Sequence, residues 1–570
     1  MWQIRKNKKT IDIDEIFMDV KNFPGYHAEN LEGVLEKPIT TKVFFILGAI
    51  FCIVSVGFLF RAVFLQVVNG DLFRLRSDNN RLRFVYIEQE RGIIYDRGGQ
   101  ILASNILRVI SNNNSTTTKA SDFKLLRRYP ENGFLHVLGY LKTEVNTTIG
   151  VSGLEEKYDD ILRGTPNKRI EEVSASGLVI GSGTNFIGNP GNGVLTSLSR
   201  NLQLKLSDFI NQTKDERCFT GGAGIVIDVT NGEILALTSI PGFNPNMLSE
   251  KLTSEEFKKI INDPGLPFFN RALFGLYPPG SIVKPAIAAG ALKEGVIDAE
   301  KEIITNGQLI LPNPYFPDKP SIFLDWKNHG AVDMRRALAV SSDVYFYEIG
   351  GGFQSQQGLG AEGIKKYFRL FGFGDATGID IFGEKTGNLP DITAKINGRS
   401  WSVGDTYHLA IGQGPLLVTP IQIAVYVAAI ASRGNIFQPH IARAIVDENK
   451  NIIQQFIYSP KRTNILPNDI FSVIHDGMRQ SALVGTASAL GGLPIRVAAK
   501  TGTAEIGKTG RVHSWSIGFF PYEKPRLAYV ILMESGSVHN LVGATYVASQ
   551  MLQWMSETNF LESLDKPIEK

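Results

Sequence analysis

The sequence predicts an α+β protein with a mainly antiparallel sheet, preceded by an N-terminal membrane helix. An apolar run without charge lies near the N-terminus. Two β-rich runs flank a Thr-Asn-Gly-Glu turn at residues 230–233, which is a strong hairpin signal. Helical patterns fill the middle of the chain, and strand patterns return at residues 495–505, 513–520 and 526–534. Strands on both sides of a helical region are typical of an α+β domain.

The composition describes a globular protein of several domains. A chain of 570 residues is too long for one core, so two or three domains are expected. Hydrophobic residues make up 43% and charged residues 20%, which excludes a disordered chain. The net charge of +3 predicts no nucleic-acid partner. Because Cys52 lies inside the apolar run and Cys218 is the other cysteine, no intrachain disulfide is predicted.

The apolar run is the predicted membrane anchor, at residues 43–67. No charge interrupts it from Val43 to Phe60, and a helix of ~20 such residues spans a ~30 Å hydrocarbon core. Arg61 can extend its side chain to the membrane surface. A buried core helix is the alternative, but such a helix is rarely apolar on every face. The run begins far into the chain and lacks a cleavage site, unlike a signal peptide.

A β-rich domain is predicted between the anchor and the hairpin, at residues 68–215. The stretch "RGIIYDRGGQILASN" at residues 91–105 has the pattern of strand, turn and strand. After a polar loop, "HVLGY" at residues 136–140 is predicted as a short strand. It leads into an amphipathic helix predicted at residues 150–164.

The stretch "YPPGSIVKP" contains Ser281 directly after a Pro-Pro-Gly break and Lys284 three positions later. If a helix begins at the break, the two side chains lie about one turn apart, as a nucleophile and its base would. A helix start also favours serine here, and Ser-x-x-Lys recurs at Ser121 and Ser563, so the pattern leaves both interpretations open. Pro285 disfavours α geometry at Lys284, which suits a strained functional turn better than a plain helix start.

Two further motifs favour the catalytic interpretation. "SSD" occupies Ser341–Asp343, and "KTGT" occupies Lys500–Thr503 at the end of an alternating strand. Ser-x-x-Lys, a Ser-x-Asn-type triplet and Lys-Thr-Gly together are the signature of serine β-lactamases and penicillin-binding proteins. Lys-Thr-Gly also occurs at Lys385 and Lys508, but in Gly-rich turns where solvated lysines are expected. A literal Ser-Asp-Asn at residues 77–79 lies beside the anchor, outside the domain.

On these motifs the chain resembles the class B penicillin-binding proteins of the elongation type, from the anchor to about residue 555. Asp343, where division-type relatives usually carry Asn, favours the elongation type. The resemblance implies a β-lactamase-like transpeptidase domain, an antiparallel sheet with helices, on a β-rich pedestal behind a transmembrane helix. The stretches that carry it are "NRALFGLYPPGSIVKP", "SSDVYFYEIG", "GEKTGNLPD", "GDTYHLAIGQGPLLVTPIQIA" and "KTGTAE", with "RGIIYDRGGQILASN" and "GVSGLEEKYDDILRG" in the pedestal.

The resemblance also implies a location and a domain order. Peptidoglycan crosslinking takes place outside the membrane, so a single-pass protein of the inner (plasma) membrane with a periplasmic or extracellular catalytic domain is expected. The expected parts are a cytoplasmic tail at residues 1–42, the anchor at 43–67, the pedestal at 68–215, the transpeptidase domain at 216–557 and a C-terminal tail at 558–570.

Five residues are expected to carry the chemistry, D-Ala-D-Ala transpeptidation. A serine hydroxyl needs an adjacent base, so Ser281 is the nucleophile and Lys284, in its neutral form, is the base. A nearby cation favours that neutral form, and Lys500 is the candidate. By resemblance, Ser341 relays a proton to the leaving amine, and Asp343 orients Lys284 and Ser341.

The substrate is expected to lie along the Lys-Thr-Gly-Thr segment. With Lys500, the segment Thr501, Gly502 and Thr503 would hold the terminal carboxylate of the donor stem. The backbone N–H groups of Ser281 and Thr503 would bind the acyl oxyanion. No cofactor and no metal is expected, because the histidines show no paired spacing and no cysteine lies near the middle motif where some relatives hold zinc. His513 and Trp515 either line this cleft or pack in the core, and packing is favoured.

The expected partners are peptidoglycan stem peptides ending in D-Ala-D-Ala, β-lactams, a SEDS-family glycan polymerase, the elongation complex and the membrane. Two other functions stay open: an acyl-serine hydrolase, such as a carboxypeptidase or β-lactamase, and a non-catalytic penicillin sensor or scaffold. One departure stands out. Only thirty residues separate Asn105 from His136, so the head subdomain usual in elongation-type relatives is predicted to be lost or very reduced.

Overall fold

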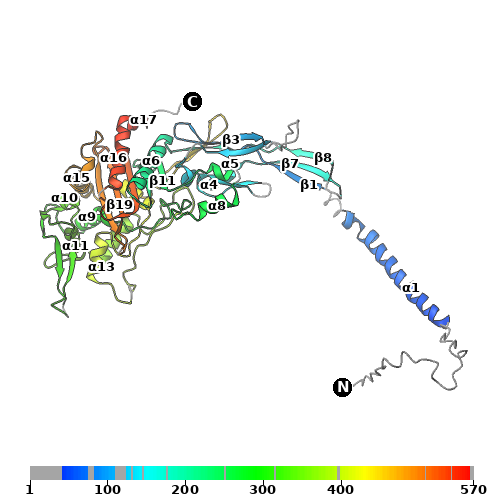
Figure 1. Ribbon diagram of the computed structural model, residues 1–570, viewed down its shortest axis with the longest axis horizontal. Helices are drawn as coiled ribbons and strands as arrows, with labels where there is room; N and C mark the ends of the chain where they lie inside the picture. The colour runs from blue at the N-terminus through cyan, green and yellow to red at the C-terminus, as the bar shows by residue number, and fades with distance from the viewer. Residues whose placement is uncertain are drawn as a thin grey trace, which may run out of the picture. The chain divides into compact units, whose positions relative to one another are not determined.

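A computed structural model describes residues 41–74, 82–109, 123–129, 132–143, 147–174, 178–249, 252–313, 316–394, 398–507, 509–540 and 542–564 (Figure 1). By contacts the chain divides into two compact units, residues 1–84 with 170–183 and residues 85–169 with 184–570. The first contains α1 (Thr41–Val63) and the π-helical turn η4 (Phe64–Val68). Thr41–Val68 is long and apolar enough to cross a membrane, and its most apolar stretch is not buried against the rest of the protein.

A six-stranded sheet forms the core of the pedestal. Its order is β17-β16-β9-β2-β3-β4, so strands of residues 442–455 join strands of residues 94–196. The sheet therefore draws on both of the expected domains. Its strands are β2 (Ile94–Tyr95), β3 (Ile101–Val109), β4 (Phe123–Arg128), β9 (Gly193–Thr196), β16 (Ala442–Val446) and β17 (Ile452–Gln455). Smaller sheets join β1 (Leu82–Ile87), β7 (Asn167–Val173) and β8 (Val179–Phe186), and β5 (Leu141–Thr143) with β6 (Thr148–Gly150).

Two local expectations in the pedestal were wrong. The predicted strand at residues 136–140 lies instead in and after the helical turn α3 (Leu135–Leu138). The single amphipathic helix is two short helices, α4 (Gly153–Lys157) and α5 (Asp159–Arg163), interrupted at Tyr158. At the first place burial decides, because Leu135, Val137 and Leu138 are all buried and an alternating strand pattern would not bury all three.

A buried ion-pair cluster holds the pedestal together. Glu155, fully buried, accepts from Arg91 Nε and Arg127 Nε, each at 2.7 Å. Arg91 also pairs with Asp159 at 2.8 Å. Burial by itself raises the pKa of Glu155, but the two arginines outweigh it and hold that pKa below its usual value. Glu155 is thus a permanent anion between fixed cations.

The region that follows the pedestal in the sequence is built on an antiparallel five-stranded sheet of order β11-β10-β20-β19-β18. The hairpin predicted at residues 230–233 joins β10 (Gly221–Asp228) to β11 (Ile234–Ile240). The three C-terminal strand patterns form β18 (Ala498–Glu505), β19 (Arg511–Phe520) and β20 (Leu527–Ser537). The expected mainly antiparallel sheet is confirmed, with the edge strand β18 carrying the Lys-Thr-Gly motif.

Helices cover both faces of this sheet, because successive strand residues point to opposite sides. Ile225 and Val530 face one core, whereas Val226 and Ile531 face the other. The first core receives α9 (Lys284–Lys293), α14 (Pro420–Ala431) and α15 (Asn468–Val484). The second receives α6 (Arg200–Glu216) and α16 (Ala544–Glu557), which lie against the sheet in Figure 1.

The remaining elements connect these layers. They are α7 (Asn246–Ser249), α8 (Ser254–Ile261), η6 (Gly280–Val283), β12 (Ile303–Thr305), β13 (Gln308–Leu311), β14 (Ser321–Leu324), β15 (Gly330–Val332), α10 (Met334–Val340), α11 (Asp343–Gly351), α12 (Gly360–Leu370), α13 (Val403–Ala410), η7 (Ser488–Leu490) and α17 (Phe560–Ser563).

Candidate active site

Ser281 lies in a 3-10 turn rather than at the first turn of an α-helix. The turn η6 covers Gly280–Val283, and α9 begins at Lys284 with Pro285 in its first turn. At that position proline loses no hydrogen bond, because the first N–H groups of a helix have no intrahelical partner. Lys284 has φ −53° and ψ −36°, so the expected conflict with α geometry does not arise.

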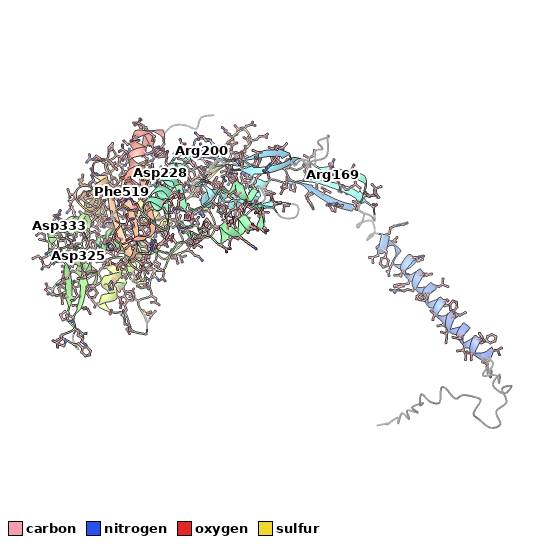
Figure 2. The ribbon with its side chains drawn as sticks, viewed as in Figure 1. Arg169, Arg200, Asp228, Asp325, Asp333 and Phe519 are labelled. Carbon is pink, nitrogen blue, oxygen red and sulfur yellow. The ribbon has the colours of Figure 1, made fainter. Side chains whose placement is uncertain are left out.

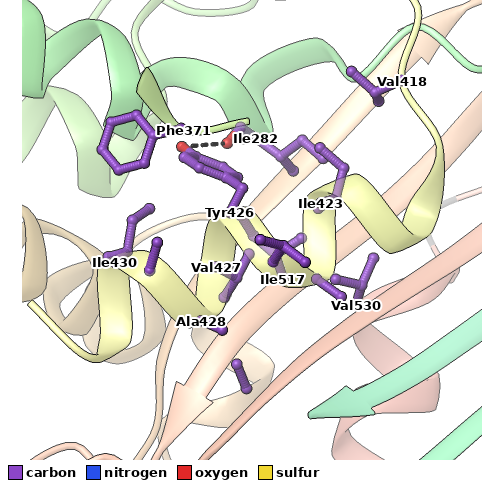
Figure 3. Close-up of a cluster of buried hydrophobic side chains, with 14 of the residues drawn as sticks. Ile282, Phe371, Val418, Ile423, Tyr426, Val427, Ala428, Ile430, Ile517 and Val530 are labelled. Carbon is purple, nitrogen blue, oxygen red and sulfur yellow. Dashed lines mark hydrogen bonds between the residues drawn. The ribbon is translucent and has the colours of Figure 1, made fainter. Parts of the chain in front are cut away.

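A tyrosine from a distant helix fixes the junction between η6 and α9. The Tyr426 hydroxyl donates to the Ile282 carbonyl at 3.2 Å, the bond drawn in Figure 3. The same hydroxyl accepts from the Ala286 N–H at 3.1 Å. It therefore stands between the carbonyl and the amide that an unbroken α-helix would join directly. Tyr426 is fully buried on α14, so the turn that carries Ser281 rests on the core.

Two glycines allow η6, the nucleophile turn that carries Ser281, to lie close to the strand β18. Gly280 has φ +59°, and a Cβ there would lie 2.8 Å from the Thr503 carbonyl oxygen. A Cβ on Gly502 would lie 3.0 Å from the Pro279 carbonyl oxygen. Side chains at these two positions would push the strand away from the serine. The backbone of the Lys-Thr-Gly-Thr segment thus borders the Ser281 turn.

Lys284 is the centre of a buried hydrogen-bond cluster. Its Nζ lies 2.6 Å from Asp343 Oδ1, 2.7 Å from the Ser341 carbonyl oxygen and 3.3 Å from Ser341 Oγ. The Lys284 side chain is completely buried, while Asp343 keeps 20% of its side-chain surface exposed. Phe346 covers the ammonium group, with Nζ 5.3 Å from the ring centroid. Within the described residues, none of these bonds joins Lys284 to Ser281 Oγ.

The Ser341 hydroxyl connects the two lysines. Its Oγ accepts from Lys500 Nζ at 2.8 Å, and Lys284 Nζ lies on its other side. Ser341 adopts the left-handed conformation, φ +60° and ψ +40°, as the residue that ends α10. This conformation is uncommon for a residue with a side chain and is found in turns and at functional sites. It places Ser341 between the helix end and Asp343, the first residue of α11.

The charges are arranged differently from the expectation. Burial and the neighbouring Lys284 charge lower the pKa of Lys500 well below its usual value, and Asp343 opposes them in part. The only carboxylate bonded to either amine in the described cluster, that of Asp343, contacts Lys284. A carboxylate partner favours the ammonium form. The neutral form of Lys500 is therefore favoured in the resting site, although Lys500 was predicted to be the nearby cation.

The three predicted substrate residues lie together on β18. Lys500 is buried and also donates to the Thr501 carbonyl at 2.8 Å. Thr501 is half-buried, Gly502 is buried and Thr503 is exposed, as expected for an edge strand with one open face. Thr501 Oγ1 donates to Thr486 Oγ1 at 2.7 Å.

Two residues of the site carried no signal in the sequence. Asp325 Oδ2 accepts from Ser342 Oγ at 2.7 Å and from the Val344 N–H at 3.1 Å, which holds the start of α11. Figure 2 labels Asp325 and also Asp333, which caps α10 locally by accepting from the Arg336 N–H. Thr486 follows α15, and its Oγ1 accepts from Thr501 Oγ1 of β18. Asp325 and Thr486 each act through a contact between distant elements, and a single sequence does not display such contacts.

The competing matches do not join this cluster. Lys385 is exposed in a Gly-rich turn, as expected. Ser563 lies in α17, where its hydroxyl donates to Phe560. Lys508, Ser121 and the Ser-Asp-Asn at residues 77–79 lie outside the described residues.

His513 and Trp515 pack behind the nucleophile turn. Trp515 is fully buried, and its Nε1 donates to the Pro278 carbonyl at 3.1 Å. Both rings contact Tyr277 edge-on, with centroid distances of 5.0 Å for His513 and 6.1 Å for Trp515. Burial lowers the pKa of His513 to about 4, so it is neutral at neutral pH. These contacts agree with the favoured packing interpretation.

Two family models match the chain. The model of the penicillin binding protein transpeptidase domain matches residues 222–552. The model of the penicillin-binding protein dimerisation domain matches residues 108–196.

Whole proteins and solved structures are similar to most of this chain. The peptidoglycan D,D-transpeptidase MrdA of Haemophilus influenzae is 27% identical over 84% of this chain and 86% of its own length. MrdA of Acinetobacter baumannii is 28% identical over 87% and 84%. Among solved structures, Pseudomonas aeruginosa PBP2 in complex with WCK 5153 has a TM-score of 0.66 at 27% identity, covering 83% of this chain and 97% of that one. PBP2 in complex with MreC from Helicobacter pylori has a TM-score of 0.67 at 25% identity, covering 84% and 99%.

Proposed function

This chain belongs to the penicillin-binding protein transpeptidase family, and on that premise we propose that it is a peptidoglycan D,D-transpeptidase of the penicillin-binding protein 2 type. It crosslinks peptide stems that end in D-Ala-D-Ala, through an acyl-serine intermediate, and is a target of β-lactams. One observation supports this most strongly. The Ser341 hydroxyl bridges two buried lysine amines beside the glycine-lined turn that carries Ser281.

In the first step Ser281 Oγ attacks the carbonyl carbon of the penultimate D-Ala. Lys284 must be neutral to take the Ser281 proton, and the bridging Ser341 hydroxyl lets its excess proton pass to Lys500, whose lowered pKa leaves that amine able to receive it. Lys500 then carries the positive charge beside the donor carboxylate. The oxyanion takes hydrogen bonds from the backbone N–H groups of Ser281 and Thr503.

In the second step the C–N bond of the terminal D-Ala breaks and its nitrogen leaves as an amine. The proton taken from Ser281 reaches that nitrogen from Lys284 through Ser341 Oγ, 3.3 Å away. An amine of a second stem then attacks the acyl-enzyme carbonyl and loses a proton to the lysine amines of the site, Lys284 and Lys500. Ser281 Oγ leaves as the hydroxyl, so the crosslink forms without net consumption of protons.

The membrane location extends the same proposal. The apolar helix Thr41–Val68 supports a single-pass anchor. We place residues 1–42 in the cytoplasm and the catalytic domain on the periplasmic or extracellular side of the inner (plasma) membrane, because the substrate lies there. The domain limits of 68–215 for the pedestal and 216–557 for the transpeptidase domain enclose the two family matches.

The partner is proposed to be a SEDS-family glycan polymerase within the elongation complex. Two similar structures support it. One is a peptidoglycan synthase complex that coordinates polymerization and crosslinking, with a TM-score of 0.68 at 26% identity over 90% of this chain and 97% of that one. The other contains PBP2 with MreC.

Covalent labelling tests the proposal. The purified protein is mixed with benzylpenicillin and its intact mass is measured, followed by peptide mapping. We expect one drug mass per chain on Ser281 and none on Ser281→Ala. Label on Ser563, or label that survives Ser281→Ala, would overturn the assignment. A label that hydrolyses rapidly at Ser281 would instead identify an acyl-serine hydrolase.

A further inference from the structure

The turn after α15 meets the Lys-Thr-Gly strand beside the site. The Thr486 N–H donates to the Ala339 carbonyl at 3.1 Å, which ties the turn to the end of α10. A Cβ on the preceding Gly485 would lie 2.1 Å from that same carbonyl oxygen, so only glycine allows the approach. Arg479 of α15 donates to the Val497 carbonyl at 2.9 Å, just before β18 begins. Thr486 is therefore held against both α10 and β18.

The Thr486 side chain is bonded to a residue of the proposed carboxylate site. Thr501 Oγ1 donates to Thr486 Oγ1 at 2.7 Å, a normal length for two hydroxyls. Ser481 Oγ lies 3.5 Å from Thr486 Oγ1, and either oxygen can donate across that longer contact. The hydroxyls thus form a row that starts on α15 and ends on the strand that borders Ser281.

A hydroxyl has one proton to donate and two lone pairs to accept with. A carboxylate has no proton, so Thr501 can bind it only by donating its own. When a carboxylate binds, the Thr501 hydroxyl must therefore turn its proton from Thr486 towards the ligand. The Thr486 hydroxyl can then donate its own proton to a lone pair of Thr501 Oγ1. A hydroxyl that accepts one bond donates more strongly in the next, because such chains polarise one another.

We propose that Thr486 is a positioning residue for recognition of the substrate's terminal carboxylate, acting through the hydroxyl of Thr501. It fixes the Thr501 side chain and reverses its hydrogen bond when an anionic acceptor binds. This inference rests on the proposed function, in which Thr501 binds the D-Ala carboxylate. The ligand class it favours is an acyl donor with a free carboxylate over the same donor with that group esterified.

The test compares two ligands on matched variants. The second-order rate constant of Ser281 acylation is measured for a penicillin and for its methyl ester, by mass spectrometry of reactions quenched at successive times. Thr486→Val keeps the shape and removes the hydroxyl, and Thr486→Ser keeps the hydroxyl. Thr238→Val on β11 is the control, since Thr238 is a buried strand threonine whose hydroxyl has no partner among the described residues.

We expect Thr486→Val to lower the rate with the free acid roughly tenfold, the effect of one hydrogen bond of ~1.4 kcal/mol. The rate with the ester should fall less than about twofold, so the preference for the acid over the ester collapses. Thr486→Ser and the control should keep the wild-type preference. If Thr486→Val does not fold, Thr486→Ala is compared in its place.

The outcomes separate the two proposals. Equal losses with both ligands, or no loss with either, would overturn the role of Thr486 while leaving Ser281 acylation in place. A wild-type protein that is not acylated at Ser281 by the penicillin would overturn the proposed function itself.

Discussion

Two regions of this protein bury charge, and they do so in opposite ways. In the pedestal Glu155 lies between Arg91 and Arg127 at 2.7 Å each, and both of these cations are always-charged guanidinium groups. In the site two lysines share one serine hydroxyl, and one carboxylate, that of Asp343, is bonded to Lys284. The pedestal arrangement fixes its protons and gives rigidity. The site has more amines than anions, so a proton can be held in more than one place, which acid–base catalysis requires.

The largest effect should come from removing one amine of the site. Lys500→Ala deletes the group that receives the proton and holds the carboxylate, and loss of one catalytic electrostatic contact typically costs 10²–10³ in rate. The acylation rate of Ser281 by benzylpenicillin measures it. Lys385→Ala is the matched control in an exposed Lys-Thr-Gly and should stay within about threefold of wild type. Similar losses in Lys500→Ala and Lys385→Ala would mean that the buried Lys-Thr-Gly motif matters no more for acylation than the exposed one.

Breaking the pedestal cluster should change stability and leave the chemistry of the folded protein intact. Glu155→Gln removes the anion that lies between two buried guanidinium groups and leaves Arg91 paired only with Asp159, which should destabilise the pedestal by about 3 kcal/mol. The midpoint of urea unfolding, followed in detergent, measures it. Asp160→Asn provides the control, because Asp160 is 97% exposed beside Arg163 and such pairs contribute little. An unchanged midpoint for Glu155→Gln would show that the buried ion pairs of the pedestal do not stabilise the protein, and so would remove the contrast with the site.

The smallest effect tests the charge balance of the site directly. Asp343 raises the pKa of Lys500 against burial and Lys284, so Asp343→Asn should lower that pKa further. It also removes the negative charge that lies 2.6 Å from Lys284 Nζ. Both changes make a neutral amine available at lower pH, so the rising limb of the acylation rate should shift towards lower pH.

The same pH profile has an internal control. Asp343→Leu removes the hydrogen-bond acceptor as well as the charge, so it should lose most activity at every pH. Superimposable profiles for wild type and Asp343→Asn would show that Asp343 does not set the proton distribution and serves only as the first residue of α11.

The sequence was sufficient for the sheet, because a sheet depends on local patterns, while the choice of motifs stays a prediction. Alternation predicted β18 to β20, and a Thr-Asn-Gly-Glu turn predicted the hairpin. The lowered pKa of Lys500, which was predicted to be the cation, was not foreseen. It depends on burial and on the charge of Lys284, which lies far away in the sequence, and no local pattern displays such a contact.

Other features lay outside any local rule. The predicted strand at residues 136–140 lies instead in and after the helical turn Leu135–Leu138, because the side chains of Leu135, Val137 and Leu138 are buried together. The left-handed backbone at Ser341 arises from the junction of α10 with α11. Asp325 and Thr486 contribute through tertiary hydrogen bonds, which appear only when distant segments meet.

The Tyr426 hydroxyl between Ile282 and Ala286 also relates catalysis to the order of folding. The residue that sets the nucleophile turn lies 140 positions further along the chain than Ala286. A nascent chain released from the ribosome only as far as Ser281 and Lys284 has both reactive groups but lacks the helix that shapes their turn. We therefore expect acylation by a β-lactam to require that α14 has been synthesised and has docked against this turn.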